Sequence, residues 1–380
     1  MEGRAIYMQQ LNGPMALPHL LRASELDTNF LTPVLFAASA AATGGGWELA
    51  DSLTRVLDGK RGRLIPLERL MLDWVIGMTR GGYPAALEAM RQAADIAPSP
   101  EMFTITAMTA LAINRPRDAL DALNQIDPES GLMRGFIVHW MNLTTALHFL
   151  SEHRRELSVA RHSLELYPGN PFLTVSLTRA LVALGRLNEA IEALGESPSH
   201  PPMNSVAAGE DAWITSTEMM AHGHPEEAAA LQHWAIEWFE SLDSEILAKP
   251  LYRYGYARQL YVTGRLDEAE GLFQELTGQI PDSVSFRGYL GSVAARRGDR
   301  DEALQISDSL VTLDRPYRFG NIYYWQARIA AVLGDRDRAI GLLHQAFDAG
   351  FEFTDAFHRD EDLLLLHGYE PFEELMRPKG

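Results

Sequence analysis

The feature that most constrains the fold of this chain is a short pattern that recurs along nearly all of its 380 residues. Each copy has a turn residue, two or three polar residues, and then a small anchor residue followed by an apolar position. The ten anchors are Ala16, Ala50, Ala86, Ala119, Leu157, Ala190, Ala228, Ala269, Ala303 and Ala339. Successive anchors are 33 to 41 residues apart. This period is typical of a repeat architecture, in which the core grows by repetition.

The copy that contains Ala303 shows what one unit is expected to fold into. Asp282 or Ser283 can cap a first helix, and Gly298 can end it in the left-handed conformation. Asp299 then caps a second helix. The small anchor fits where the two antiparallel helices approach closely, since a larger side chain would overpack the contact. The pattern therefore predicts about ten helix pairs, or about 20 helices, and no sheet.

These units closely resemble the tetratricopeptide repeat family. A second small residue of the family pattern, seven positions after the anchor, is present at Ala23, Ala93 and Ala346. The small residue twelve positions before the anchor is present at Ala38, Ala107, Ala257, Gly291 and Ala327. Leu157 departs from the pattern. The resemblance implies an all-α solenoid superhelix of antiparallel helix pairs that holds other proteins or peptides in a concave groove.

A proline- and serine-rich stretch at residues 196–204 interrupts the array. It divides the chain into half-arrays at 1–195 and 205–350, or it is a long loop within one continuous solenoid. Residues 351–380 depart from the repeat and are predicted to be a terminal cap that folds back on the last unit. The chain starts inside a unit, with a short helix expected at residues 4–11 and an apolar edge at Ile6, Tyr7 and Met8. We therefore expect an upstream domain, or a partner that covers this edge.

The repeats and the ending around residues 358–376 are also similar to the C-terminal repeat regions of bacterial serine/threonine kinases and transcriptional regulators. That resemblance implies a sensory or docking part of a bacterial signalling system. A ligand-sensing regulatory module is accordingly the alternative to a protein–protein interaction scaffold.

Composition limits the partners. The formal net charge is −18, which argues against nucleic acid and against anionic membrane surfaces. Cysteine is absent, and no run of 18 apolar residues is present. No signal-peptide core follows the N-terminus, so a cytoplasmic location is expected by default.

No catalytic, cofactor or metal motif is recognisable, and we predict a protein that is not an enzyme. The histidines at 148, 153 and 162 do not have the spacing of a zinc hydrolase helix, and His222 and His224 flank a turn glycine. Both groups are interpreted as surface or satisfied histidines. Residues 360–362 (Asp-Glu-Asp) are interpreted as a solvated acidic turn.

In the tetratricopeptide family the first helix of each pair lines the groove, so the resemblance implies which residues face a partner. Arginine, asparagine and tyrosine are expected there, because guanidinium groups bind carboxylates through forked hydrogen bonds and tyrosines anchor interfaces. The predicted partner-binding residues are Asn142, Arg179, Tyr254, Arg258, Tyr261, Arg296, Asn321, Tyr324 and Arg328. The alternative is that these arginines pair with acidic residues of the chain itself.

Overall fold

The computed structural model describes residues 13–27, 29–196 and 207–380. The helix expected at residues 4–11, the apolar edge at Ile6, Tyr7 and Met8, and most of the stretch at 196–204 lie outside these residues. Within the described residues all regular secondary structure is helical. None of the described helices is both long enough and apolar enough to cross a bilayer.

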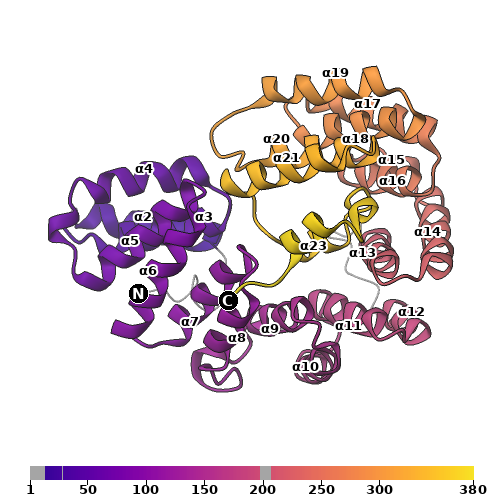
Figure 1. Cartoon of the computed structure of the whole chain (residues 1–380). Coiled ribbons are helices and arrows are strands. Elements are labelled where there is room, and N and C mark those ends of the chain that lie inside the picture. Colours follow the sequence, from indigo (N-terminus) through magenta and orange to yellow (C-terminus); the bar gives the residue numbers. More distant parts are fainter. Residues whose placement is uncertain (1–12, 28, 197–206) are drawn as a thin grey trace. The chain divides into compact units, whose positions relative to one another are not determined.

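The chain forms two compact units (Figure 1). Unit 1 comprises residues 1–146, 349–353 and 378–380, and unit 2 comprises residues 147–348 and 354–377. The main division between the units lies at Ala146–Leu147. The predicted half-arrays at 1–195 and 205–350 meet at a stretch that the structure leaves largely undescribed, and they stay a prediction.

Unit 1 is built from helices joined by short turns. They are α2 (Gly13–Leu26), α3 (Thr32–Thr43), α4 (Trp47–Asp58), η1 (Arg61–Arg63), α5 (Pro66–Thr79), α6 (Tyr83–Ile96), α7 (Pro100–Leu111), α8 (Pro116–Leu123), η2 (Gly131–Met133) and most of α9 (Ile137–Phe149). Consecutive helices pack as pairs, and α3 also packs on α5, so that each pair stacks on the next.

Unit 2 continues the same arrangement. Its helices are α10 (His153–Leu166), α11 (Pro171–Ala183), α12 (Leu187–Glu196), α13 (Ala207–Ala221), α14 (Pro225–Glu240), α15 (Ser244–Leu247), α16 (Pro250–Val262), α17 (Leu266–Gln279), α18 (Val284–Arg297), α19 (Arg300–Ser309), η3 (Leu310–Leu313), α20 (Asn321–Val332) and α21 (Arg336–Asp348). The first helices stack on one another as α11 on α13 and α18 on α20. The all-α architecture of stacked helix pairs is therefore confirmed.

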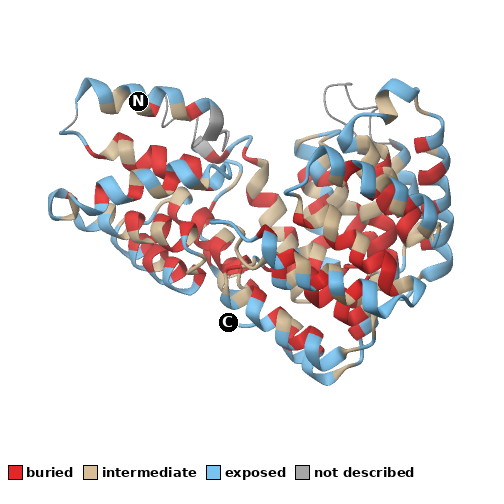
Figure 2. Cartoon of the chain, turned by 90° about the horizontal axis from the view of Figure 1, so that it is seen from above, coloured by how far each residue is buried: buried red, intermediate tan, exposed pale blue. Residues whose placement is uncertain are grey.

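The anchors explain the pairing. Nine of the ten are the fourth residue of a second helix, and all nine are fully buried alanines, from Ala16 to Ala339. Buried residues lie on the inward sides of the paired helices within each unit (Figure 2). The contact leaves little room, since a Cβ built on Gly77 would lie 2.8 Å from the Cβ of the anchor Ala86. A small residue at the anchor thus lets two helices touch along their backbones.

The unit around Ala303 follows its predicted local chemistry. The Ser283 side chain accepts a hydrogen bond from the Phe286 amide at the start of α18, and Gly298 ends that helix with a φ of 86°. Asp299 is the N-cap residue of α19, although its side chain makes no capping hydrogen bond. The interval between the anchors Ala228 and Ala269 is the longest, and α14, which contains Ala228, has 16 residues from Pro225 to Glu240.

The end of the chain, where a terminal cap is predicted, is divided between the two units. Residues 349–353 belong to unit 1, and residues 354–377 belong to unit 2. The latter, hereafter the C-terminal segment, contain α22 (Asp355–His358), η4 (Leu363–Leu366) and α23 (Glu370–Met376). Phe357, Leu363, Leu366 and Phe372 of this segment are buried, so the segment is part of the core of unit 2.

Candidate binding faces and a buried histidine cluster

We call the surface formed by the first helix of each pair the first-helix face. In unit 2 it consists of α11, α13, α16, α18 and α20, and the C-terminal segment lies against it. The acidic residues 360–362 of this segment converge on one arginine. Arg328 of α20 lies 3.3 Å from Asp360, 2.6 Å from Glu361 and 2.9 Å from Asp362.

Aromatic hydroxyls complete this arrangement. Tyr261 donates to Asp362 (2.5 Å), Tyr289 donates to Glu361 (3.0 Å), and Tyr324 donates to Asp360. Arg296 donates to Asp362 (2.9 Å) while its guanidinium lies over the ring of Tyr261. A buried carboxylate is stable only when its oxygens are hydrogen-bonded and its charge is balanced, and the first-helix face of unit 2 supplies both.

The acidic residues are therefore not a solvated turn, contrary to expectation. Asp360 is 4% exposed and Asp362 is fully buried. Burial alone would raise the pKa of the Asp362 carboxyl, but Arg328 and Arg296 outweigh it and hold the pKa below its usual value. Burial raises the pKa of Asp360 to about 6, even beside Arg328.

The nine residues predicted to face a partner have three different environments. Arg179, Tyr261, Arg296, Tyr324 and Arg328 contact the C-terminal segment. Arg258 pairs with Glu210 of α13 and lies over the rings of Trp213 and Tyr254. Asn142 lies on α9 in unit 1, and Asn321 is the first residue of α20. That these residues bind an external partner stays a prediction.

A second group of polar side chains, buried or half-buried, lies beside the start of the C-terminal segment. We call it the histidine cluster: His148, His153, Glu156, Glu218, His222 and His358. The Nδ1 atom of His148 lies 3.0 Å from Glu156, and its Nε2 atom lies 3.2 Å from Glu218. Glu218 also lies 3.0 Å from Nε2 of His222, and His153 lies 3.2 Å from Glu156. Arg179 donates to Glu156 (2.8 Å) and to Asp355 (3.2 Å).

Burial and charge separate the pKa values of these groups. Burial alone would lower the pKa of His148, but the carboxylates of Glu218 and Glu156 raise it to about 9. Burial likewise favours neutral Glu156, but Arg179 and His148 lower its pKa to about 2. No carboxylate of the described residues lies as close to His358, and burial lowers its pKa to about 4.

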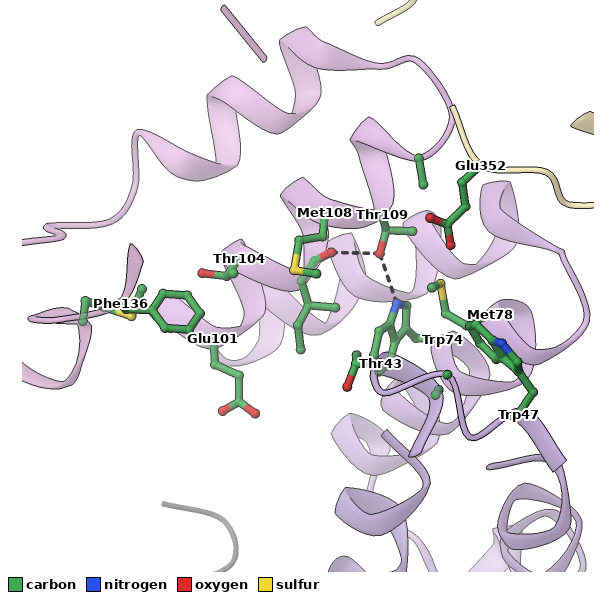
Figure 3. Close-up of a pocket in the computed structure, with 15 residues that line it drawn as sticks. Thr43, Trp47, Trp74, Met78, Glu101, Thr104, Met108, Thr109, Phe136 and Glu352 are labelled. Atoms are coloured by element: carbon green, nitrogen blue, oxygen red, sulfur yellow. Dashed lines mark hydrogen bonds between the residues drawn. The ribbon is translucent and has the colours of Figure 1, made fainter. Parts of the chain in front are cut away.

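In unit 1 the first-helix face consists of α3, α5 and α7, and it contains an apolar cavity of about 360 Å³ (Figure 3). The aromatic and methionine side chains around it are Trp47, Trp74, Met78, Met108, Met133 and Phe136. The Trp74 indole donates to Thr109 (3.1 Å), whose hydroxyl donates to the Ile105 carbonyl (2.8 Å). These hydrogen bonds fix the tryptophan that forms one wall.

Polar groups of the cavity are few. Its lining includes the carboxylates of Glu101 and Glu352 but no lysine or arginine. Glu352 accepts a hydrogen bond from Tyr83. The Thr104 hydroxyl oxygen is buried and has no hydrogen-bond partner among the described residues. The face is therefore apolar with a negative edge.

Comparison with known proteins identifies the repeat. The tetratricopeptide repeat family model matches residues 254–317, which comprise most of α16 through η3. Residues 254–317 contain tetratricopeptide repeats. The same helix pairs with buried anchors continue on both sides of the matched residues.

Solved structures that are similar to the chain share little sequence with it. A tetratricopeptide repeat protein from Parabacteroides merdae is 14% identical, with 80% of this chain and 99% of that chain covered and a TM-score of 0.37. The human IFIT1 dimer with m7Gppp-AAAA is 13% identical, with 94% and 84% covered and a TM-score of 0.36. None of the curated proteins matches the chain.

The predicted anchor Leu157 is wrong by one position, and the residue at the equivalent position belongs to the histidine cluster. The N-cap of α10 is Glu152, so the position equivalent to the other anchors is Glu156 and not Leu157. A fully buried glutamate thus replaces the small residue of the repeat. A charged residue at this position was the available signal for a polar site, because the repeat otherwise excludes large polar side chains there.

Proposed function

We propose that this chain is a non-catalytic scaffold that binds a peptide or protein segment on the first-helix face of unit 1. The observation that supports the proposal is a difference between two equivalent faces. In unit 2 the chain's own C-terminal segment covers the face, whereas in unit 1 the face has an apolar cavity between Trp47, Trp74 and Phe136.

The chemistry of the cavity favours a particular occupant. Its volume of about 360 Å³ suits a large apolar side chain together with adjoining backbone. Met78 and Met108 are unbranched and adaptable, as in surfaces that accept several apolar anchors. Because Glu101 and Glu352 are the charged residues of the lining, lysine or arginine should flank the anchor of the ligand.

The chain's own backbone illustrates how such a face can hold an extended segment. In unit 1 the Phe353 amide donates to the Ala112 carbonyl at the end of α7 (2.9 Å). In unit 2 one tyrosine each of α16, α18 and α20 donates to the successive side chains of residues 362, 361 and 360 in the C-terminal segment. A peptide in unit 1 would use the same mode with apolar anchors in place of acidic ones.

A peptide array tests this proposal. The peptides carry leucine, phenylalanine or methionine as the anchor, flanked by lysine and arginine or by aspartate and glutamate, and fluorescence anisotropy gives their affinities. We expect the basic-flanked peptides to bind. Met108→Asp should weaken that binding at least about tenfold, since it places a charge in an apolar site. The matched control is Val56→Asp, at an exposed position of α4.

Three outcomes would refute the proposal. The first is equal binding of acidic-flanked peptides, and the second is binding that Met108→Asp leaves unchanged. The third is thermal stabilisation by small metabolites without peptide binding, which would favour the ligand-sensing module instead.

A further inference from the structure

The histidine cluster has more nitrogen and oxygen ligands than its internal hydrogen bonds use. Four of its residues, His148, Glu218, His222 and His358, each offer one such atom, and these atoms all lie within 4.8 Å of one another. The ring centroids of the three histidines are 5.4 to 5.7 Å apart. All four residues belong to unit 2.

Two atoms of this group lack any partner among the described residues. They are Nε2 of His358 and Oε2 of Glu218, and both are buried. Buried polar atoms without a partner are rare in folded proteins, because the desolvation cost is then uncompensated. Three imidazoles that meet at one carboxylate are also unusual for a core that is held by hydrogen bonds alone.

We propose that His148, His222, His358 and Glu218 bind one divalent transition-metal ion, with Zn²⁺ as the preferred ion. Imidazole nitrogen and carboxylate oxygen are ligands that zinc takes in proteins, at about 2.0 to 2.2 Å and with tetrahedral geometry. Such bond lengths place neighbouring ligand atoms about 3.4 Å apart. The other Glu218 oxygen, Oε1, already lies 3.2 Å from Nε2 of His148 and 3.0 Å from Nε2 of His222.

The surrounding residues have the arrangement that orients metal ligands. A metal-binding histidine usually donates its other ring nitrogen to a carboxylate, which fixes the ring and its tautomer. His148 has this contact, because its Nδ1 lies 3.0 Å from Glu156. Arg179 in turn donates to Glu156 (2.8 Å). The same arginine disfavours a metal at the alternative trio of His148, His153 and Glu156, since it places a cation beside Glu156.

The ligands come from distant parts of the sequence, and this suggests a structural role. His148 is near the end of α9, Glu218 is on α13, His222 directly follows α13, and His358 is on α22. Four protein ligands leave no open position on a tetrahedral ion, which is typical of structural and not of catalytic zinc. The ion would fasten the C-terminal segment to α9 and α13.

Titration of the untagged, chelator-treated full chain with Zn²⁺ and with Co²⁺ tests the proposal. We expect about one ion per chain and a Co²⁺ absorption spectrum with the intensity of four-coordinate cobalt. His358→Ala and His222→Ala should each weaken Zn²⁺ affinity at least about 100-fold, and Glu156→Gln about tenfold. His233→Ala, at an exposed position of α14, is the control and should bind as the wild type does.

The wild-type titration remains decisive if a variant fails to fold, which circular dichroism would reveal. Zn²⁺ should also raise the melting temperature of the wild type and of His233→Ala but not of His358→Ala. Absence of saturable binding by the wild type would overturn the proposal. A six-coordinate Co²⁺ spectrum would also overturn it. An equal loss of Zn²⁺ affinity in the cluster variants and in His233→Ala would do the same.

Discussion

The first-helix faces of the two units are built by the same repeat and yet differ in chemistry. The face of unit 2 has Arg296, Arg328 and several tyrosines, and the chain's own acidic segment covers it. The face of unit 1 has Trp74 and Met108 around an apolar cavity. The anchors hold the helix pairs together in both units, so residues on the first helices are free to differ. A repeat of this kind therefore determines the backbone of a face but not its ligand.

The comparison also separates two roles that a groove arginine can have. An arginine that contacts an external partner is needed for binding and not for folding. An arginine that binds a buried segment of its own chain is needed for folding. Arg328 is only 3% exposed and contacts three carboxylates, which favours the second role.

Removal of Arg328 is expected to have the largest effect. Arg328→Ala leaves the buried carboxylates of residues 360–362 without their main counter-charge, so unit 2 should lose about 4 kcal/mol of unfolding free energy. Urea denaturation followed by circular dichroism measures this loss. Arg338→Ala is the control, because Arg338 is 39% exposed and its closest carboxylate oxygen, on Asp308, is 3.6 Å away. Its effect should stay within about 0.5 kcal/mol. Equal stability of the two variants would show that the acidic segment does not depend on Arg328.

Replacement of Glu156 tests whether the histidine cluster or the repeat pattern dominates at an anchor. Glu156→Ala introduces the usual small residue but leaves His148 and Arg179 without their shared carboxylate. We expect a loss of about 3 kcal/mol, again from urea denaturation. Glu152→Ala, at the partly exposed N-cap of α10, should change stability by no more than about 0.5 kcal/mol. A Glu156→Ala protein as stable as the wild type would show that alanine suits this anchor as well as it suits the others.

Most of the fold could be predicted because its signals are local. A turn residue, a cap and a small anchor lie within a few positions of one another, and they specify where each helix pair begins and where its helices touch. Gly298, Ser283 and the alanine anchors illustrate this. The pattern predicts one anchor wrongly, at Leu157. The structure has Glu156 at that position, where a buried charge replaces the small residue of the pattern.

The candidate sites could not be predicted in the same way, because they depend on contacts between residues far apart in the sequence. No spacing indicates that Asp362 meets Tyr261, or that His358 lies beside His148 and His222. Residues 360–362 resemble a surface turn when they are considered alone. They become core residues only because arginines of α18 and α20 neutralise them.

The smallest expected effect concerns the cavity of unit 1, where one buried hydroxyl has no partner among the described residues. Thr104→Val removes that hydroxyl and keeps the side-chain shape, so it should leave unfolding free energy unchanged or raise it by about 1 kcal/mol. Thr109→Val is the matched control, because it breaks hydrogen bonds to Trp74 and Ile105 and should cost about 1 to 2 kcal/mol.

If a peptide backbone normally pairs with Thr104, the same Thr104→Val protein should bind basic-flanked peptides more weakly in the anisotropy assay. Equal destabilisation by the two substitutions would mean that the Thr104 hydroxyl already has a partner within the chain, and the face of unit 1 would then resemble the filled face of unit 2.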